Sequence, residues 1–291
     1  MSKMKTIMEG WRKFESLIEK ADPSKLDLKR FPIELDKVDV KAAQVTSRSG
    51  GADGSVEDDV IDVNVGASFS VSELKPSQST MKISNSVTMA ISMLAKLQGR
   101  DGMAIGGDLG GFISSDKHIM DGHHRWVATA MVDPSEKVVG YYVDFPATQL
   151  IAVLNNITKG RFQQMKGKAG SGSFADFNYA GILKQLQEYA TNGIPGKYPR
   201  AAEDVLLTCE KFTGMEGQKA VIATAKKFAA NVKQLQFQVP AAAPPRDQMP
   251  VIDGGDRAKE AAVALSLGQV DVNPPYASTS SSQKGRKNEK E

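Results

Sequence analysis

Between residues 61 and 158 the hydrophobic period of the sequence changes several times, and this change constrains the fold more than any other feature. Strand-like alternation at 62–65 and 69–71 stops at Pro76, and apolar residues at i, i+3, i+4 and i+7 then predict a helix over 84–97. The elements expected after this helix are strands over 112–114, 118–120 and 138–145, a helix opened by residues 121–125, and a helix over 148–158. Strands and helices in this order predict a small α+β domain.

The sequence on either side of this region predicts three further parts. Residues 1–60 combine an amphipathic helical pattern over 4–20 with a polar stretch over 41–59, so we expect a helical arm and a flexible linker. Residues 159–239 are expected to be helical, with helices near 174–191, 200–213 and 216–236. Residues 240–291 are expected to contain a Pro/Ala linker over 240–250, a helix over 256–267 and a disordered tail over 278–291.

Composition restricts the environment in which the chain works. No stretch approaches the roughly 20 apolar residues of a membrane-spanning helix, and the single cysteine, Cys209, cannot form an internal disulfide. We therefore expect a cytoplasmic protein without a membrane partner. The net charge is only +3, but residues 159–291 carry 19 basic and 13 acidic side chains. Any attraction to DNA is expected to reside in this basic C-terminal part.

The only three histidines of the chain, His118, His123 and His124, lie within seven residues of each other. Two of them belong to the motif Asp121-Gly122-His123-His124-Arg125, which we expect at a turn from strand to helix. The first backbone N–H groups of a helix have no internal partners and carry partial positive charge. Gly122 allows close backbone approach, Asp121 can cap the helix or orient an imidazole, and the His and Arg side chains add donors. The motif therefore predicts a phosphate site.

Together with the upstream motif Ser72-Glu73-Leu74-Lys75-Pro76-Ser77-Gln78, this turn resembles the ParB/sulfiredoxin superfamily (ParB-like nuclease domains). That superfamily includes the N-terminal domain of ParB partition proteins, sulfiredoxin, free serine kinase and the DGQHR proteins of DNA modification. The resemblance covers roughly 61–158 and rests on two motifs about 40 residues apart. It implies a mixed sheet and a nucleotide-dependent enzyme, either an NTP hydrolase or a phosphotransferase, with nuclease activity as a further member activity. The implied cofactors are a nucleoside triphosphate, ATP or CTP, and Mg²⁺.

The resemblance also assigns roles to individual residues. His124 and Arg125 would contact nucleotide phosphates, and Glu73 would act as general base or magnesium-side carboxylate. The full predicted site comprises catalytic Glu73 and His124, phosphate-binding Lys75, Ser77, Gln78, Gly122, His123, His124 and Arg125, orienting or capping Asp121, and Asp108 as a weak metal candidate. The chain departs from the family in three ways: no cysteine adjoins His124-Arg125, the arginine-rich second box of ParB CTPases is absent, and the helix-turn-helix of partition proteins is not evident after Thr158. Neither sulfinic-acid chemistry nor a CTP-gated DNA clamp is therefore expected.

Other interpretations of these residues remain open. His118, His123, His124 and Asp116 could form a metal site, although adjacent helical histidines point about 100° apart. The glycine-rich stretch 106–111 could wrap a phosphate or be a flexible turn, and the cationic stretch 159–168 could be a solvated loop or a nucleic-acid contact.

The N-terminus suggests an alternative function. Residues 4–11 resemble the leader of proteins packaged into the heads of tailed bacteriophages, in which proteases cut after an Ile/Leu-x-Glu pattern. Ile7-Met8-Glu9 and Leu17-Ile18-Glu19 both match this pattern. The alternative is therefore a phage DNA-binding or head-packaged virion protein that uses the same fold without catalysis, with phage head components as partners. The simpler interpretation of these residues is an amphipathic docking helix.

Overall fold

The computed structural model of the chain describes residues 20–48, 56–167, 169–252 and 255–272. The predicted N-terminal helix (except Lys20), both protease-like patterns and the predicted C-terminal tail lie outside these residues. The strands are β1 (Val63–Ser70), β2 (Lys75–Pro76), β3 (Gly107–Ile113), β4 (His118–Ile119) and β5 (Lys137–Val143). The α-helices are α2 (Val40–Thr46), α3 (Ile83–Leu97), α4 (His123–Val132), α5 (Ala147–Gly160), α6 (Tyr179–Asn192), α7 (Ala202–Thr213), α8 (Gly217–Val232) and α9 (Gly255–Ser266). Short 3-10 turns are η1 (Pro23–Lys25), η2 (Leu35–Lys37), η3 (Glu57–Asp59), η4 (Val71–Glu73), η5 (Phe174–Asp176) and η6 (Arg246–Gln248).

The five strands form one mixed sheet in the order β1-β5-β3-β4-β2. The strand pairs β1–β5 and β3–β4 are antiparallel, whereas β3–β5 and β2–β4 are parallel. Successive residues of a strand point to opposite faces. Accordingly, Ile113 and Ile119 enter one hydrophobic cluster, while their neighbours Phe112 and Met120 enter a second one. The sheet therefore separates two apolar cores.

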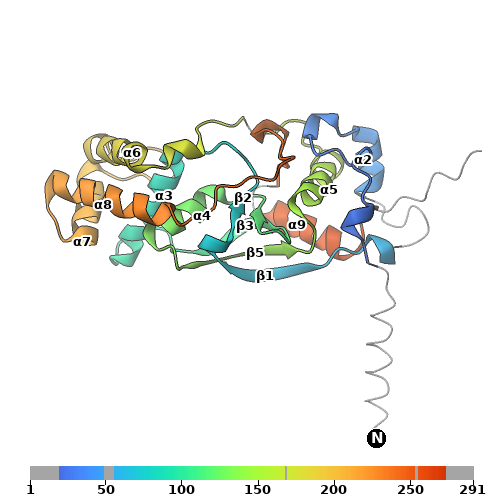
Figure 1. Cartoon of the computed structure of the whole chain (residues 1–291), viewed down its shortest axis with the longest axis horizontal. Coiled ribbons are helices and arrows are strands. Elements are labelled where there is room, and N and C mark those ends of the chain that lie inside the picture. The colour runs from blue at the N-terminus through green and yellow to red at the C-terminus, as the bar shows by residue number, and fades with distance from the viewer. Residues whose placement is uncertain (1–19, 49–55, 168, 253–254, 273–291) are drawn as a thin grey trace, which may run out of the picture.

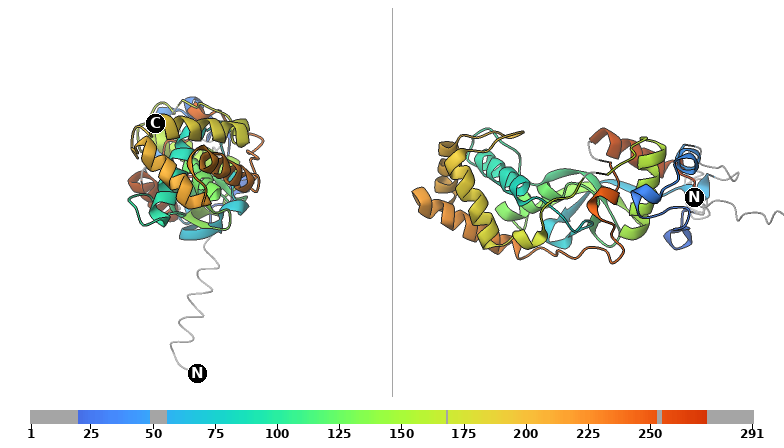
Figure 2. Two further views of the ribbon diagram at one scale, coloured as in Figure 1. Left: turned by 90° about the vertical axis from the view of Figure 1, so that its left-hand side faces the viewer. Right: turned by 90° about the horizontal axis from the view of Figure 1, so that it is seen from above.

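Each core is closed by its own set of helices. The first cluster contains residues of α3, α4, α6, α7 and α8, and the second contains residues of α5 and α9. The molecule is elongated, with α6, α7 and α8 at one end, the sheet in the middle, and α2 and α5 at the other end (Figures 1 and 2). None of the described helices is both long and apolar enough to cross a lipid bilayer.

The α+β class predicted from the sequence is confirmed, and most periodic segments form the expected elements. The helix predicted over 84–97 is α3, and that over 148–158 is α5 with two more residues at its C-terminal end and one at its N-terminal end. The two strand pieces at 62–71 form one strand, β1, which carries a register shift between Val65 and Ala67. The bulge lies at Gly66, whose φ of 75° suits glycine.

Two segments predicted to be linkers are instead packed against the body. Within the polar stretch 41–59, residues up to Thr46 belong to α2, which packs along α5. The contact requires a glycine in α5, because a Cβ at Gly160 would lie 2.0 Å from the carbonyl oxygen of Ala43. Similarly, Met249 in the Pro/Ala-rich stretch is fully buried in the second cluster.

The glycine-rich stretch 106–111, one of whose interpretations was a flexible turn, forms the first half of β3. Its register with β5 shifts between Asp108 and Phe112. A Cβ at Gly106 would lie 2.4 Å from the carbonyl oxygen of Lys137, so glycine permits the strand to approach β5 closely. That close approach explains the glycine in structural terms.

The start of the cationic stretch 159–168 is packed against the protein and does not form a solvated loop. Lys159 is buried, with its Nζ 3.4 Å from the carbonyl oxygens of Asp36 and Val38. Arg161 donates from Nε to Glu260 at 2.7 Å. These two cations therefore serve the packing of the chain rather than a solvent-exposed binding loop.

Candidate functional site

The two motifs that were about 40 residues apart in sequence lie side by side in the structure. Strand β2 pairs in parallel with β4, so that Lys75 is opposite His118 and Pro76 is opposite Ile119. His118 Nδ1 lies 2.8 Å from the carbonyl oxygen of Pro76, and this oxygen can only accept, so Nδ1 carries the proton. The indole Nε1 of Trp126 donates to the carbonyl oxygen of Val71 at 2.7 Å. The motifs thus form one structural unit.

His123 connects the start of α4 to the non-helical segment that follows β2. The backbone N–H of Ser77 donates to His123 Nε2 at 3.2 Å, so the imidazole is neutral with its proton on Nδ1. Protonating Nε2 would remove this acceptor. Burial lowers the pKa of His123 well below its usual value, and the charge of Arg246 lowers it further.

Gly122 shapes the turn between β4 and α4. It is the N-cap of α4 and has φ 83°, in the left-handed region that favours glycine. A Cβ at this position would also lie 2.8 Å from the carbonyl oxygen of Leu109. Gly122 therefore brings the first turn of α4 against β3, while the close approach to a ligand that the motif predicted stays a prediction.

The N-termini of α3 and α4 lie at the same end of a parallel helix pair. The ammonium group of Lys82, the N-cap of α3, acts electrostatically on His124 in the first turn of α4. At the other end of the pair, Leu97 of α3 and Val132 of α4 line one cavity. Neither N-cap residue provides a side-chain cap to its helix. Two uncapped helix N-termini thus add their partial positive charges at one place.

Several buried polar atoms at this place lack a hydrogen-bond partner among the described residues. They are Ser77 Oγ, Gln78 Oε1, Thr80 Oγ1 and His124 Nε2. Ser77 is fully buried and Gln78 is 3% exposed. Buried polar groups in proteins are nearly always hydrogen-bonded, so such a group of unpaired atoms indicates a place for water or a ligand.

His124 is neutral at physiological pH. Burial lowers its pKa to about 4, and the positive charges of Arg246 and Lys82 contribute to this shift. A neutral imidazole offers one donor and one acceptor nitrogen. The local charge is therefore supplied by Arg246 and Lys82 rather than by the histidines.

Arg246 and Lys82 were not predicted as site residues. Arg246 lies in η6, within the stretch expected to be a linker, which crosses between the two ends of the molecule (Figure 1). A Cβ at Gly170 would lie 2.8 Å from Arg246 Cβ and 2.3 Å from Thr80 Oγ1, so these two residues border the same glycine. The Pro/Ala composition around Arg246 contains no motif that would have marked it.

Arg125 contacts protein carbonyl groups. Its Nε donates to the carbonyl oxygen of Gly106 at 2.7 Å, and its Nη2 lies 3.4 Å from the carbonyl oxygen of Ala104. The arginine predicted to contact phosphate therefore also holds the segment that enters β3.

The remaining predicted residues have local structural contacts. Glu73 is exposed and its Oε2 accepts the N–H of Ser70 at 3.2 Å in a capping box. Asp108 Oδ1 accepts the N–H of Gly110 at 2.8 Å. Lys75 in β2 is half-buried and lies opposite His118, and Asp121 packs against Gly111. No contact among the described residues joins Glu73 or Asp108 to the histidines.

The described part of the chain does not contain the ligand set that a metal ion would need. No group of three or more His, Cys, Asp or Glu side chains gathers there. His118 Nδ1 and His123 Nε2 are already used by Pro76 and Ser77. The described residues at the turn consequently do not fit a histidine-bound metal ion.

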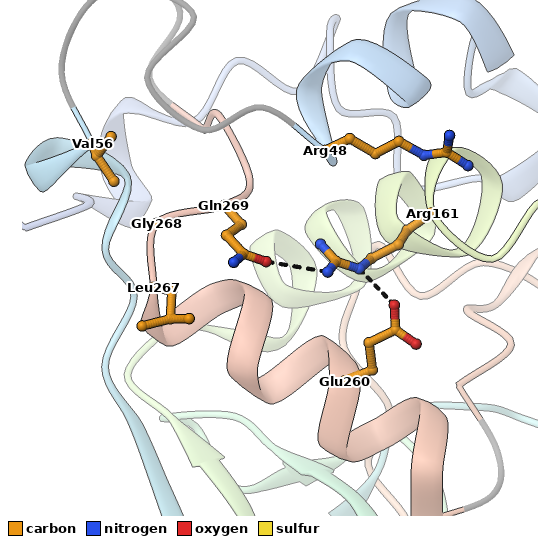
Figure 3. A pocket seen from close by; sticks show the side chains of 7 residues that line it. All are labelled: Arg48, Val56, Arg161, Glu260, Leu267, Gly268 and Gln269. Carbon is orange, nitrogen blue, oxygen red and sulfur yellow. Dashed lines mark hydrogen bonds and ion pairs between the residues drawn. The ribbon is translucent and has the colours of Figure 1, made fainter.

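A separate cavity of about 670 Å³ lies away from both motifs, on α5 and α9 (Figure 3). Arg161 crosses it, donating to Glu260 at 2.7 Å and to Gln269 at 3.1 Å. Arg48 and Val56 also line it, and they flank residues 49–55, which lie outside the described chain. None of its lining residues belongs to the predicted site.

Comparison of the chain with protein-family models, with curated proteins and with solved structures returns no match. The ParB/sulfiredoxin resemblance consequently rests on the two motifs alone.

Proposed function

We propose that this chain binds the phosphate groups of a nucleoside triphosphate, ATP or CTP, where the N-termini of α3 and α4 meet. The observation that carries the proposal is the set of unpartnered buried atoms that can donate, Ser77 Oγ, Thr80 Oγ1 and His124 Nε2, beside the cations Lys82 and Arg246. Leaving a buried polar group unpaired costs about 1–3 kcal/mol. Phosphate oxygens would accept from the hydroxyl, imidazole and cationic donors, and would so recover part of this cost.

The proposed site combines predicted and newly found residues. The uncapped first turn at Gly122, His123 and His124 would donate backbone N–H groups to the phosphates. Lys75, Ser77 and Gln78 would form the wall on the β2 side, and Lys82 and Arg246 would supply charge. Arg125 would act indirectly, because it holds the segment around Gly106.

For the chemical step we propose transfer of the terminal phosphoryl group of the nucleoside triphosphate to water or to a hydroxyl acceptor. A new P–O bond forms to the acceptor, the bond to the nucleoside diphosphate breaks so that the diphosphate leaves, and a base takes the acceptor's proton. Charge develops on the phosphoryl oxygens in such reactions, so preorganised donors at His124, Lys82 and Arg246 would stabilise the transition state. Glu73 is the proposed base, as the family resemblance implies; its carboxylate is exposed, and Oε2 accepts a hydrogen bond from Ser70. The described carboxylates do not gather for Mg²⁺, and the proposal includes no step through that ion.

Removing the Lys82 ammonium group tests the proposal. We expect Lys82→Ala to weaken binding of ATP or CTP about tenfold, because one positive charge near the phosphates is lost. Lys96→Ala is the matched control, since both lysines are exposed and lie at opposite ends of α3. Isothermal titration calorimetry measures both variants, and only Lys82→Ala should change affinity.

Two outcomes would contradict the proposal. If the two variants bind nucleotide with equal affinity, the phosphates do not bind at the N-terminus of α3. Absence of nucleotide binding, together with DNA binding that weakens steeply with salt, would instead favour the DNA-binding alternative.

A further inference from the structure

A second cavity begins one helical turn from Lys82. It has a volume of about 610 Å³ and lies between α3, the end of α6 and the loop 195–198. Asn85 and Met89 are four residues apart and lie along one face of α3, and Lys82, the N-cap of this helix, comes three residues before Asn85. Asn85 and Met89 line the cavity. One turn of helix is about 5.4 Å long, so the cavity adjoins the proposed phosphate site.

Tyr189 lines the floor of this cavity, and its hydroxyl group already makes two hydrogen bonds within the protein. Tyr189 Oη accepts from Thr88 Oγ1 at 3.0 Å and donates to the carbonyl oxygen of Ser84 at 3.1 Å. Tyr189 is 6% exposed, and burial raises its pKa. The floor is therefore a neutral aromatic surface with no unpaired polar atom.

The rim presents an aromatic ring and polar groups to a ligand. Tyr198 is half-exposed, and the Nζ of Lys197 lies 5.5 Å from its ring centroid. Asn85 is exposed, and its amide provides both a donor and an acceptor. Glu188 accepts from Gln185 at 3.2 Å through Oε2. Aromatic faces combined with an amide and a carboxylate suit a flat heterocycle with donors and acceptors on its edge.

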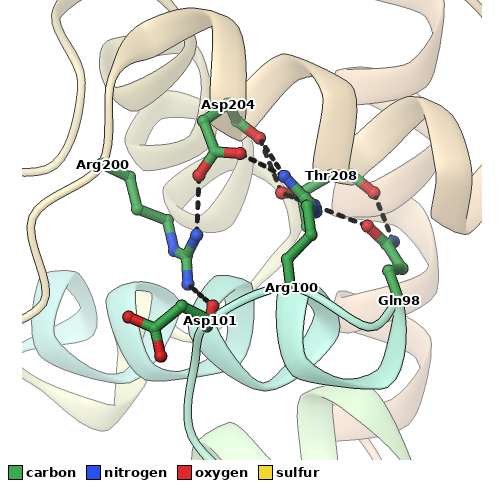
Figure 4. Close-up of polar contacts among 6 residues, drawn as sticks. All are labelled: Gln98, Arg100, Asp101, Arg200, Asp204 and Thr208. Carbon is green, nitrogen blue, oxygen red and sulfur yellow. Dashed lines mark hydrogen bonds and ion pairs between the residues drawn. The ribbon is translucent and has the colours of Figure 1, made fainter.

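The loop that carries Tyr198 is held in place by the network in Figure 4. Ile194 and Arg200 exchange two backbone hydrogen bonds, of 2.8 and 3.0 Å, across the base of the loop. Arg200 Nη1 donates to Asp204 at 2.6 Å, and the same carboxylate contacts Arg100 (Figure 4). The loop is therefore fixed to α7 and to the segment after α3. Such a preformed wall binds a ligand without first having to be ordered.

We infer that the cavity between α3 and α6 receives the nucleoside part of the nucleotide, with Tyr198 stacking on the base and Asn85 contacting its edge. The inference rests on the proposed phosphate site and names the part of the ligand that lies beyond it. Cavities that hold small molecules have volumes of roughly 300–1,000 Å³, and this one falls in that range. The site would then use residues of α6 and its following loop, outside the region of 61–158 that carries the family resemblance.

The test compares a nucleotide with a phosphate chain that has no base. Calorimetry on the full chain measures the affinities of ATP, CTP and inorganic tripolyphosphate. We expect Tyr198→Ala to weaken binding of the preferred nucleotide about tenfold and to leave tripolyphosphate binding unchanged, because only the stacked base is affected. Asn85→Ala should act in the same direction. Tyr179→Ala is the matched control, since this tyrosine is 38% exposed on α6 and does not line the cavity.

Different results would overturn different parts of the account. If tripolyphosphate and nucleotide both bind but Tyr198→Ala and Asn85→Ala leave their affinity ratio unchanged, the base is not in this cavity. If neither ATP, CTP nor tripolyphosphate binds the wild-type chain, the phosphate site and the inference built on it both fail. Unchanged thermal unfolding midpoints of the variants would exclude misfolding as the cause of any loss.

Discussion

His124 is largely buried and has an unpaired ring nitrogen. Its protonation therefore changes the free energy of unfolding of the chain. Its pKa is about 4 in the folded chain and about 6.5 when unfolded. Because the folded-state value is depressed, the unfolded state binds a proton first as the pH falls. The stabilising contribution is complete above about pH 6.5 and is lost progressively toward pH 4.

We predict that wild-type protein loses about 3 kcal/mol of unfolding free energy through His124 between pH 6.5 and pH 4. His124→Gln removes this titration and should make the pH dependence shallower over the same range, leaving the part that comes from His123, whose pKa is also lowered. Urea unfolding at several pH values measures the difference. Parallel pH profiles for wild type and variant would show that the imidazole is not held neutral by the fold.

At the scale of elements, the packing of α2 on α5 corrects the predicted linker and leads to a stability prediction. A Cβ at Gly160 would lie 2.0 Å from the backbone carbonyl oxygen of Ala43, whereas one at Gly255 would meet no atom within 4 Å. We expect Gly160→Ala to destabilise the protein by about 1–3 kcal/mol, because the two helices must move apart. Gly255→Ala, at the start of α9, is the control and should be close to neutral. Equal unfolding midpoints in chemical denaturation would mean that α2 does not pack on α5 as described.

The elements that the sequence predicts best are those with strong hydrophobic periodicity. In α3, the face formed by Val87, Ala90, Ile91 and Leu94 is almost fully buried, as its spacing indicates. The glycines of β3 were harder to interpret, since their role depends on Lys137 and Arg125, which are distant in sequence. The stretch 240–252 has no periodicity at all, and its path is fixed by contacts with distant segments. Asn155 Nδ2 of α5 donates to the carbonyl oxygen of Gln248 at 3.1 Å, and the N–H of Asp36 in η2 donates to Gln248 Oε1 at 2.9 Å.

The residues of the candidate site likewise include some that the sequence predicts and some that only the fold reveals. The turn at Gly122 was predicted from a motif whose residues are close in sequence. Its placement beside the segment around Ser77 was implied by the family resemblance, since Ser77 and His123 are 46 residues apart. Lys82 and Arg246 did not follow, because a single lysine or arginine has no recognisable pattern until the fold brings it near His124.

At the scale of the whole molecule, the sheet holds the two motifs together between two apolar cores, and the helical end beyond α3 adds a second cavity. The sheet positions the three histidines, while α6 and the loop 195–198 line the cavity beside α3. We therefore propose that the phosphates bind at the sheet and that the nucleoside binds at the helices that follow it in sequence.

The central claim, that phosphates bind at His124, is tested most directly by nitrogen NMR of the full chain labelled at histidine. The three imidazoles give few signals, and His124→Gln assigns the one that matters. We predict that adding ATP or tripolyphosphate shifts the ring nitrogens of His124 strongly, because an unpaired nitrogen gains a charged partner. Binding measured by calorimetry with no change in the His124 signals would contradict the account.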